Sequence, residues 1–453
     1  MQGPVVDVKF ASIEEVPDVY CVIKVETVDH REVTLEVAEH IPGNIARCIS
    51  INSTQNLQRN AKAVSQNHSI EVPVGQALYG RLVNVLGQPI DLKGAISVKE
   101  MLPIRTDELG TMVRGDMKKK RNPEVLETGI KIIDLLFPLV KGSKNGILGG
   151  AGLGKSLITL EIIHNIVQRQ QGTCVFVGIG ERIREGNELY LELSTHNIFS
   201  KTILVFGQMN EPPGARYGVA MTGATIAESI QKQNQDVLLF VDNIFRFIQA
   251  GAEISTLLGR VPSETGYQPT LISEASEFHE RIRSGEGVGG SITSIEAVYV
   301  PADDMTDPAV VAIFTFLESL MVLSRERVQL GLYPAIDPLL SSCANLDPDV
   351  VGSRHFKVSQ ETIRIFQKYD ELRRLVMVIG IDELSSADRI IYDRARKLQN
   401  FLTQPFTIAE AYTGKKGAYV ELSDTLRGCE DIMAGRYDRR PEEEFYMIGS
   451  TAF

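Results

Sequence analysis

Residues 149–156 read Gly-Gly-Ala-Gly-Leu-Gly-Lys-Ser, a glycine-rich stretch that ends in a cation and a hydroxyl group. Glycines at this spacing let successive backbone N–H groups turn toward one anion. The ammonium group of Lys155 then supplies charge to the terminal phosphates, and the hydroxyl of Ser156 can ligate Mg²⁺. The pattern therefore predicts a site for a nucleoside triphosphate and Mg²⁺. Its expected contact residues are Gly149, Gly150, Ala151, Gly152, Leu153, Gly154, Lys155, Ser156 and Leu157.

Two apolar runs in the central part of the chain lead into carboxylates. Val237–Val241 ends in Asp242, a candidate for the Mg²⁺ side of the site, with a simple strand cap as the alternative. Glu181 follows the run Thr173–Gly178 and is a candidate to orient or deprotonate a water nucleophile. Ligands bind at the carboxyl ends of parallel strands. We therefore expect the Thr173–Gly178 strand to lie next to the strand before the loop, so that Glu181 faces the γ-phosphate.

Two arginines follow these carboxylates closely in the sequence. Arg182 comes directly after Glu181, and Arg246 lies four residues past Asp242. Guanidinium groups so placed can spread the charge that develops on the transition-state oxygens. The alternative for each arginine is a surface ion pair, which contributes little free energy.

The elements that must position these residues follow from the apolar pattern, which divides the chain into residues 1–74, 75–350 and 351–453. The first part has short runs rich in Val, Ile and Thr, which predict a small β-barrel or sandwich. In the second part, strand patterns alternate with longer helical segments, which predicts a nucleotide-binding domain with a parallel sheet covered on both faces. Its expected strands are Thr173–Gly178, Thr202–Phe206, Val237–Val241 and Ile295–Val300.

The third part is expected to be an α-helical domain, because Ser359–Val376 and Ser386–Leu402 have the helical period. One local signal conflicts with this, since Leu375–Ile379 has the propensity of a strand. The longest apolar stretch, from Ala309 to Leu323, contains Glu318 and is too short to span a bilayer. We expect it to form a buried helix.

The overall composition limits the possible functions. The 453 residues carry a formal net charge of −11, which argues against nucleic acid as the main partner, because phosphate binding needs clustered Lys and Arg. We expect the basic run 118–121 to be a solvated loop and the glycine-rich segment 285–290 to be mobile. No two of the five cysteines have metal-ligand or disulfide-framework spacing, which indicates a reducing compartment. The first residues show no signal or transit pattern.

Five long motifs extend these signals through nearly the whole chain. They are Gly-Glu-Arg-Ile-Arg-Glu-Gly-Asn-Glu-Leu-Tyr (180–190), Gly-Gln-Met-Asn-Glu-Pro-Pro-Gly-Ala-Arg (207–216), Asp-Asn-Ile-Phe-Arg-Phe (242–247), Pro-Ser-Glu-Thr-Gly-Tyr-Gln-Pro-Thr-Leu (262–271) and Tyr-Val-Pro-Ala-Asp-Asp-Met-Thr-Asp-Pro-Ala (299–309). Together with the phosphate loop, they resemble the catalytic beta subunit of F-type ATP synthases. The noncatalytic alpha subunit of that family has Gln where this chain has Glu181, so the resemblance is to the catalytic type.

The resemblance implies a multidomain α/β protein with an N-terminal β-barrel, a central RecA-like P-loop NTPase domain with a parallel sheet, and a C-terminal α-helical domain. It implies an enzyme that makes or hydrolyses ATP with Mg²⁺, coupled to rotation and ion translocation. The expected partners are alpha-type subunits in an alternating hexamer, a gamma-type central shaft and a membrane rotor. The expected location is the cytoplasmic face of a bacterial inner membrane, with an organelle matrix or stroma as the alternative.

The resemblance also implies roles for single residues near the phosphates. Lys155, Arg182 and Arg246 match phosphate contacts. Glu181 matches the catalytic carboxylate, and Ser156 matches the Mg²⁺ ligand.

The remaining matched residues lie farther from the reacting phosphate. Asp242 matches an acid that reaches the metal through water, and Glu192 matches a carboxylate in its outer shell. Tyr333, Phe406 and Tyr412 match the aromatic box that holds adenine. From their residue types alone, these three aromatics are expected to be core residues.

Other matches concern the shaft, and here the chain departs from the family. The acids that match the shaft-contacting loop are Asp303, Asp304 and Asp307; without the resemblance they would indicate a capped helix start. Residues 382–388 lack two acids of the family's shaft-pushing lever, and Ala344 replaces a usual arginine. Two alternatives stay open. An export or flagellar secretion ATPase shares the sheet and the loop, although the motif at 207–216 and the remaining Asp-Glu-Leu-Ser at 382–385 argue for the synthase. A nucleotide-binding paralogue with a structural or regulatory role is kept open by Ala344. The intact Glu181 argues against the paralogue.

Overall fold

The computed structural model describes residues 3–105, 123–150, 152–170, 172–196, 198–282, 290–301 and 304–451. The chain forms two compact units. The first comprises residues 1–119 and 173–316, and the second comprises residues 120–172 and 317–453. The basic run 118–121 and residues 285–289 of the glycine-rich segment lie outside the described residues. In the described part, no helix combines the length and the apolar character needed to cross a membrane.

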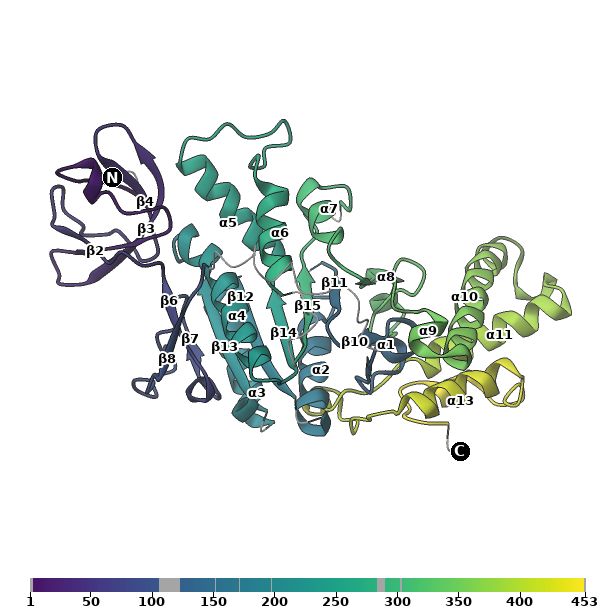
Figure 1. Cartoon of the computed structure of the whole chain (residues 1–453). Coiled ribbons are helices and arrows are strands. Elements are labelled where there is room, and N and C mark those ends of the chain that lie inside the picture. The colour runs from purple at the N-terminus through teal and green to yellow at the C-terminus, as the bar shows by residue number, and fades with distance from the viewer. Residues whose placement is uncertain are drawn as a thin grey trace. The chain divides into compact units, whose positions relative to one another are not determined.

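The N-terminal part of the first unit is an antiparallel five-stranded sheet with the order β1-β4-β3-β2-β5, of which Figure 1 labels β2, β3 and β4. Strands β1, β2, β3 and β4 bury most of their apolar residues, whereas the short β5 is only partly covered. The buried residues form a core that includes Ile23, Leu35 and Val37, all fully buried. The short runs of the sequence thus become the expected β-domain. Its strands are β1 (Val5–Lys9), β2 (Val22–Glu26), β3 (Glu32–Ile41), β4 (Ile45–Ser50) and β5 (Ala63–Ser65).

The rest of the first unit is built on five parallel strands with the order β15-β14-β12-β13-β7. Every residue of β15 is buried, and helix α4 packs along β12, β13 and β14. The strands are β7 (Leu82–Val83), β12 (Thr173–Glu181), β13 (Thr202–Gln208), β14 (Val237–Asp242) and β15 (Ile292–Val298). A two-stranded ribbon and five helices accompany them: β6 (Glu71–Val74), β8 (Glu100–Pro103), α3 (Ile183–Thr195), α4 (Pro213–Lys232), α5 (Ile244–Leu257), α6 (Leu271–Arg281) and α7 (Pro308–Phe314).

The expected central strands are therefore confirmed, but the expected neighbour of one of them is wrong. β12 pairs with β13 along one edge and with β14 along the other. Both edges are occupied, so β12 does not lie next to the strand that precedes the phosphate loop. Strand order depends on pairing between distant segments, which a local pattern does not encode.

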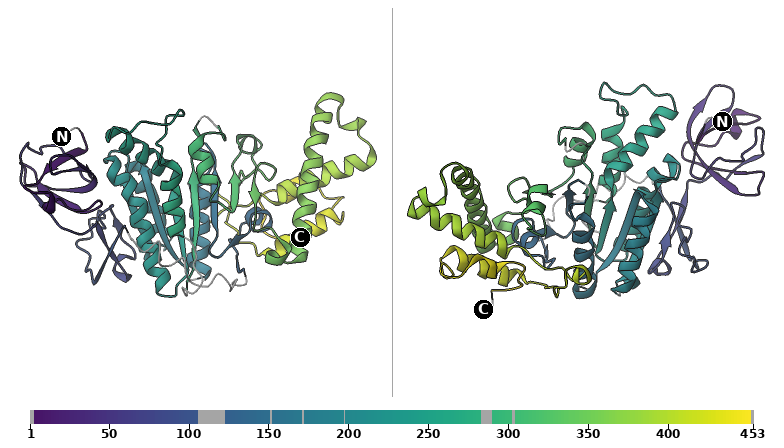
Figure 2. Two further views of the ribbon diagram at one scale, coloured as in Figure 1. Left: turned by 45° about the horizontal axis from the view of Figure 1, so that its top comes forward. Right: turned by 180° about the vertical axis from the view of Figure 1, so that it is seen from behind.

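In the described part of the second unit, strands β17, β16 and β11 pair in that order, β10 and β9 form a separate pair, and helices make up most of the rest. Helices α10, α11 and α13 pack against one another, as the yellow-green and yellow ribbons in Figure 2 show. The strands are β9 (Val125–Leu126), β10 (Leu139–Val140), β11 (Lys144–Leu148), β16 (Ser319–Val322) and β17 (Ser342–Cys343). The helices are α1 (Lys131–Leu136), α2 (Lys155–Gln170), α8 (Arg325–Gln329), α9 (Pro348–Val351), α10 (Ser353–Ile379), α11 (Ser386–Phe401), α12 (Glu410–Thr413) and α13 (Leu422–Met433).

Two ambiguous apolar segments have different outcomes. The stretch from Ala309 to Leu323 is not one buried helix: helix α7 ends at Phe314, and strand β16 begins at Ser319 and pairs in parallel with β11. An apolar run of this length fits either element, and strand pairing decides between them. The strand-like Leu375–Ile379 continues helix α10, so the helical surroundings override the local propensity there.

The altered segment 382–388 has a local structural role. The side chain of Ser385 accepts a hydrogen bond from the backbone N–H of Asp388 at 3.1 Å, and its own hydroxyl donates to the Asp388 carboxylate at 2.7 Å. This reciprocal pair caps the N-terminus of α11.

Candidate active site

The phosphate loop connects β11 to α2 within the second unit. Gly152 and Gly154 have φ values of +78° and +90°, which favour glycine. Gly149 is needed for space, because a Cβ there would lie 2.9 Å from the Cβ of Leu323. Ala151 lies outside the described residues, whereas Gly150 and Leu153 are buried within the loop. The loop thus has the backbone turns that its sequence predicts.

The first turn of α2 presents the polar residues of the loop. The Nζ atom of Lys155 donates a hydrogen bond to the carbonyl oxygen of Gly149 at 2.7 Å. Ser156 and Leu157 are exposed, and the first backbone bond of the helix runs from the N–H of Ile158 to Gly154. A helix start of this kind offers N–H groups and partial positive charge to an anion.

In the first unit, Glu181 ends β12 and is buried. One oxygen of its carboxylate lies 3.4 Å from Nη1 of Arg246, which is on the first turn of α5. Within the described residues this Nη1 atom is buried and makes no hydrogen bond. The guanidinium group therefore has capacity left to bind an anion next to the carboxylate.

The pKa of Glu181 is raised. Burial is the main cause, a hydrogen bond with Glu185 and the negative charge of Asp242 add to it, and Arg246 opposes it. Asp242 belongs to the same edge of the sheet, since Gly178 of β12 pairs with it in register. The structure thus brings together three residues that the sequence singled out: Glu181, Asp242 and Arg246.

Gly180 allows this arrangement. Its φ is +61°, and a Cβ at this position would lie 3.0 Å from Cδ of Arg246. The side chain of Arg246 therefore passes over the bare backbone beside Glu181. The sequence places Gly180 in a long motif but gives no sign of this contact.

Two other predicted residues lie on α3 or directly before it. Arg182 precedes α3 with its side chain 70% exposed, and it lies 3.7 Å from Glu185. Glu192, on α3, is half-buried, and burial raises its pKa. The predicted phosphate contact of Arg182 and the predicted outer-shell role of Glu192 stay predictions.

The three aromatic candidates belong to the second unit and differ in exposure. Phe406 is 7% exposed, Tyr333 is 41% exposed and Tyr412 is 77% exposed. In the described part of the chain, no stacked or edge-to-face pair joins them. The expectation of core residues, made from residue type, is wrong for Tyr333 and Tyr412, because large exposed rings are not core. Their surface position leaves the rings accessible to a ligand.

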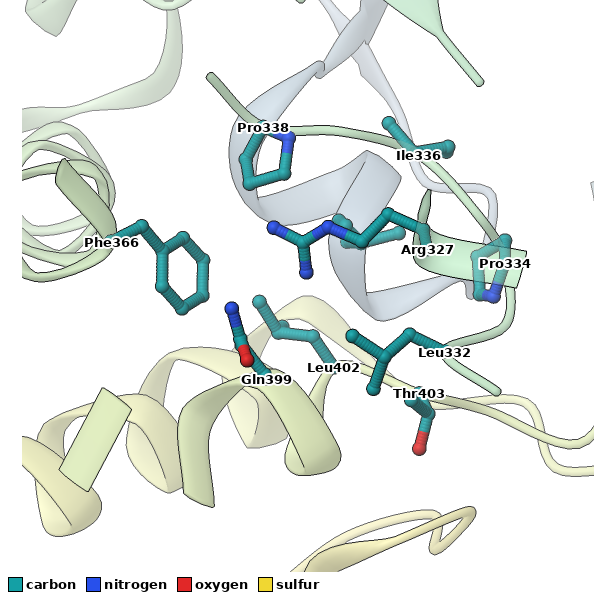
Figure 3. Close-up of a pocket in the computed structure, with 10 residues that line it drawn as sticks. Arg327, Leu332, Pro334, Ile336, Pro338, Phe366, Gln399, Leu402 and Thr403 are labelled. Carbon is teal, nitrogen blue, oxygen red and sulfur yellow. The ribbon is translucent and has the colours of Figure 1, made fainter. Parts of the chain in front are cut away.

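A pocket in the second unit is lined by the two residues on either side of Tyr333. These two residues, Leu332 and Pro334, are buried in the pocket wall, together with side chains from α1, α8, α10 and α11. Figure 3 shows the guanidinium group of Arg327 extending across this pocket toward the ring of Phe366. None of the lining residues is a predicted site residue. The buried side chains of Leu332 and Pro334 thus anchor the segment that carries Tyr333.

The sequence did not indicate Tyr446 as a residue of this region. Its hydroxyl donates to the carbonyl oxygen of Gly331 at 2.8 Å, and its ring lies 5.0 Å from Nζ of Lys415. Burial and the proximity of Tyr333 raise its pKa. Only the tertiary structure shows the contact, because more than a hundred residues separate Tyr446 from Gly331.

The loop acids that the resemblance links to a shaft have local partners. Asp307 caps α7 by accepting from the N–H groups of Ala309 and Val310 at 2.9 and 3.3 Å. Asp304 accepts from the N–H and hydroxyl of Thr306. Asp303 lies outside the described residues. The capped helix start is thus present, and contact with a shaft stays a prediction.

The loop, the parallel strands and the carboxylate-guanidinium cluster are those of a P-loop nucleotide-binding protein. Comparison with known families narrows this class to one family. Residues 129–343 match the nucleotide-binding domain of the ATP synthase alpha/beta family, and residues 1–66 match the β-barrel domain of that family. Residues 344–438 match the C-terminal domain of V and A type ATP synthase. The chain belongs to the ATP synthase alpha/beta family. Its expected fold, with a β-barrel, a nucleotide-binding domain and a helical C-terminal domain, is confirmed.

Proposed function

We propose that this chain is the catalytic, beta-type subunit of a rotary F-type ATP synthase. It makes or hydrolyses ATP where it meets alpha-type subunits. The observation that carries the proposal is the buried Glu181 carboxylate beside the guanidinium group of Arg246 at the end of β12. Membership of the ATP synthase alpha/beta family supports nucleotide binding, and the complete phosphate loop supports a triphosphate ligand.

In the hydrolysis direction, Glu181 positions a water molecule and accepts its proton as the water oxygen bonds to the γ-phosphorus. The bond from that phosphorus to the bridging oxygen breaks, and ADP and phosphate leave. Lys155, Arg182 and Arg246 balance the charge on the phosphate oxygens. Synthesis is the reverse of these steps.

Mg²⁺ would be carried by the nucleotide, and when bound it neutralises the phosphate oxygens. Ser156 exposes its hydroxyl at the start of α2, and Asp242 ends β14 with partial exposure, so each of the two is suited to bind such an ion or its water. Among the described residues, no group of three or more His, Cys, Asp or Glu side chains could hold a metal ion by itself. Phosphate oxygens and water would therefore supply most of the ligands.

The proposed partners follow from the same assignment. Alpha-type subunits would alternate with this chain in a hexamer around a gamma-type shaft, and a membrane rotor would couple rotation to ion movement. The complex would act at the cytoplasmic face of a bacterial inner membrane.

The purified chain alone should bind Mg·ATP but hydrolyse it poorly, because the proposed site takes one further arginine from a neighbouring alpha-type subunit. Equilibrium binding and steady-state ATPase assays on the isolated chain, before and after assembly with alpha-type subunits, measure this difference. An arginine supplied in trans contributes about 10³–10⁵ in turnover to related phosphoryl transfer. Fast turnover by the monomer would count against the proposal.

Replacing Gly180 with alanine should lower the ATPase activity of the assembled complex by about ten- to hundredfold, since small displacements of catalytic groups cost rates of this order. The new Cβ would push against Arg246 at 3.0 Å. Gly259→Ala is the matched control: Gly259 has a φ of +77°, but among the described residues a methyl group added there would meet no atom within 4 Å beyond its chain neighbours. Both variants carry backbone strain of about 1–2 kcal/mol, visible in thermal unfolding. Equal activities of the two variants would remove Arg246 from the site.

One observation favours a second candidate. The C-terminal match is to the V and A type domain, so the chain would then be a nucleotide-binding subunit of a V/A-type rotary ATPase. Identifying the subunits that co-purify with the chain decides between the two. A gamma-type shaft with alpha-type subunits supports the F-type assignment, and a V/A-type set of stalk subunits supports the alternative.

A further inference from the structure

Helix α2 carries a buried carboxylate that the proposed chemistry does not use. Glu161 is fully buried, and its two oxygens accept hydrogen bonds from successive backbone N–H groups. The N–H of Thr407 donates to Oε1 and the N–H of Ile408 donates to Oε2, each at 3.1 Å. Phe406, the middle residue of the proposed adenine box, comes immediately before these two donors.

The same helix begins at the phosphate loop. Lys155 is its first residue, and Glu161 follows six residues later, about 9 Å along the helix axis. Helix α2 therefore carries two groups of the proposed site. Lys155 is proposed to contact the terminal phosphates, and Glu161 holds the segment that is proposed to contact the base. Both ends belong to the second unit, so the connection lies within one compact body.

The chemistry of the anchor requires a carboxylate. Two parallel N–H donors need two acceptor oxygens, which an ionised carboxylate provides. A glutamine of the same size would place its NH₂ group against one of the donors. That donor would then be buried without an acceptor, and the segment around Phe406 would move to satisfy it.

The segment has other attachments that do not depend on Glu161. The side chain of Gln404 donates to the carbonyl oxygens of Gly129 and Ala418, at 2.7 and 2.5 Å, and accepts from the N–H of Lys131 at 2.9 Å. Gly417 packs closely on Thr407, since a Cβ there would lie 2.4 Å from the Cα of Thr407. Loss of the Glu161 contacts should therefore shift the Phe406 segment without unfolding it.

We propose that Glu161 is a positioning residue for adenine recognition: through Thr407 and Ile408 it holds Phe406 at a set distance from the phosphate loop. The inference rests on the proposed nucleotide-binding function and adds the residue that joins the two halves of that site. Under this proposal, Glu161 affects the binding of the adenine base and does not affect the binding of the phosphates.

The test compares two probes on the isolated full-length chain, Mg·ATP and Mg·tripolyphosphate, by titration calorimetry. In Glu161→Gln, the Kd for ATP should rise by about tenfold, the equivalent of one unsatisfied hydrogen-bond donor, while the Kd for tripolyphosphate stays within about twofold. Glu161→Asp keeps the charge on a shorter side chain and should fall between the wild type and Gln. Glu361→Gln, an exposed carboxylate paired with Arg364 on α10, is the matched control.

The possible outcomes separate the two proposals. A selective loss of ATP affinity, graded from Asp to Gln, supports the positioning role. An equal loss for both probes means that Glu161 only supports the helix, and no loss for either means that the anchor is dispensable; each overturns the inference. A wild-type chain that binds neither probe overturns the nucleotide site itself and the inference with it. A wild-type chain that binds both probes equally keeps the phosphate site but shows no base recognition, and so overturns the inference alone.

Discussion

Glu181→Gln lowers the steady-state ATPase rate of the assembled complex by about 10²–10⁴-fold and leaves Mg·ATP binding nearly unchanged. This range is what a positioned general base contributes. Glutamine keeps the size of the side chain and a carbonyl oxygen beside Arg246, but it does not take a proton from water. Glu181 is buried at the end of β12, so little solvent is available to replace its carboxylate as the proton acceptor.

The raised pKa of Glu181 adds a pH dependence to this prediction. Only the ionised carboxylate can accept a proton, and its fraction falls as the pH drops below its pKa. Burial, together with Glu185 and Asp242, raises that pKa, so kcat/KM should decline on the acid side at a higher pH than for an ordinary glutamate, whose pKa is about 4.3. A pH-rate profile of kcat/KM measures this limb.

The control for the glutamine variant is Glu188→Gln. Glu188 lies on α3, is exposed and pairs with Arg184 at 2.8 Å, so its loss should change neither binding nor turnover. Single-turnover rates and equilibrium nucleotide binding, measured on both variants, separate the chemical step from binding. Near-normal turnover in Glu181→Gln would assign the water-orienting role to another residue.

The second large effect is expected from Lys155→Gln. It should weaken Mg·ATP binding by about ten- to hundredfold, because an ammonium-phosphate contact is a charge-assisted hydrogen bond. Turnover should fall by a further 10²–10³-fold or so, since charge on the γ-phosphate oxygens increases in the transition state. The Nζ atom of Lys155 donates to the Gly149 carbonyl, so the ammonium group lies at the loop itself.

Binding titrations with Mg·ATP and Mg·ADP measure this effect and localise it. Comparing the loss of ATP affinity with the loss of ADP affinity reports contact with the terminal phosphate. The Kd for ADP should therefore rise less than the Kd for ATP. Lys368→Gln, which removes a surface pair with Glu371 on α10, is the matched control and should bind both nucleotides normally. Unchanged ATP affinity in Lys155→Gln would contradict a phosphate contact.

Much of the fold could be predicted because its signals are local. Parallel strands that are buried on both faces appear in the sequence as continuous apolar runs, and β12, β13, β14 and β15 were found in this way. The prediction of one buried helix from Ala309 to Leu323 was wrong, because an apolar run does not show whether it will pair with another strand. The predicted neighbour of β12 was wrong for the same reason, because both edges of β12 pair with strands that are distant in the sequence.

The candidate site divides in the same way. By itself, the sequence predicted the glycine-rich turn at 149–156 and the strand-ending acids Glu181 and Asp242, because each depends on a few consecutive residues and on the strand before them. A triphosphate ligand at that turn stays a proposal. The tertiary structure alone decided that Arg246 lies beside Glu181 over Gly180, and that Glu161 holds the segment of Phe406. These contacts join residues far apart in the chain, and their energy depends on burial and on hydrogen-bond geometry, which arise only when the chain packs.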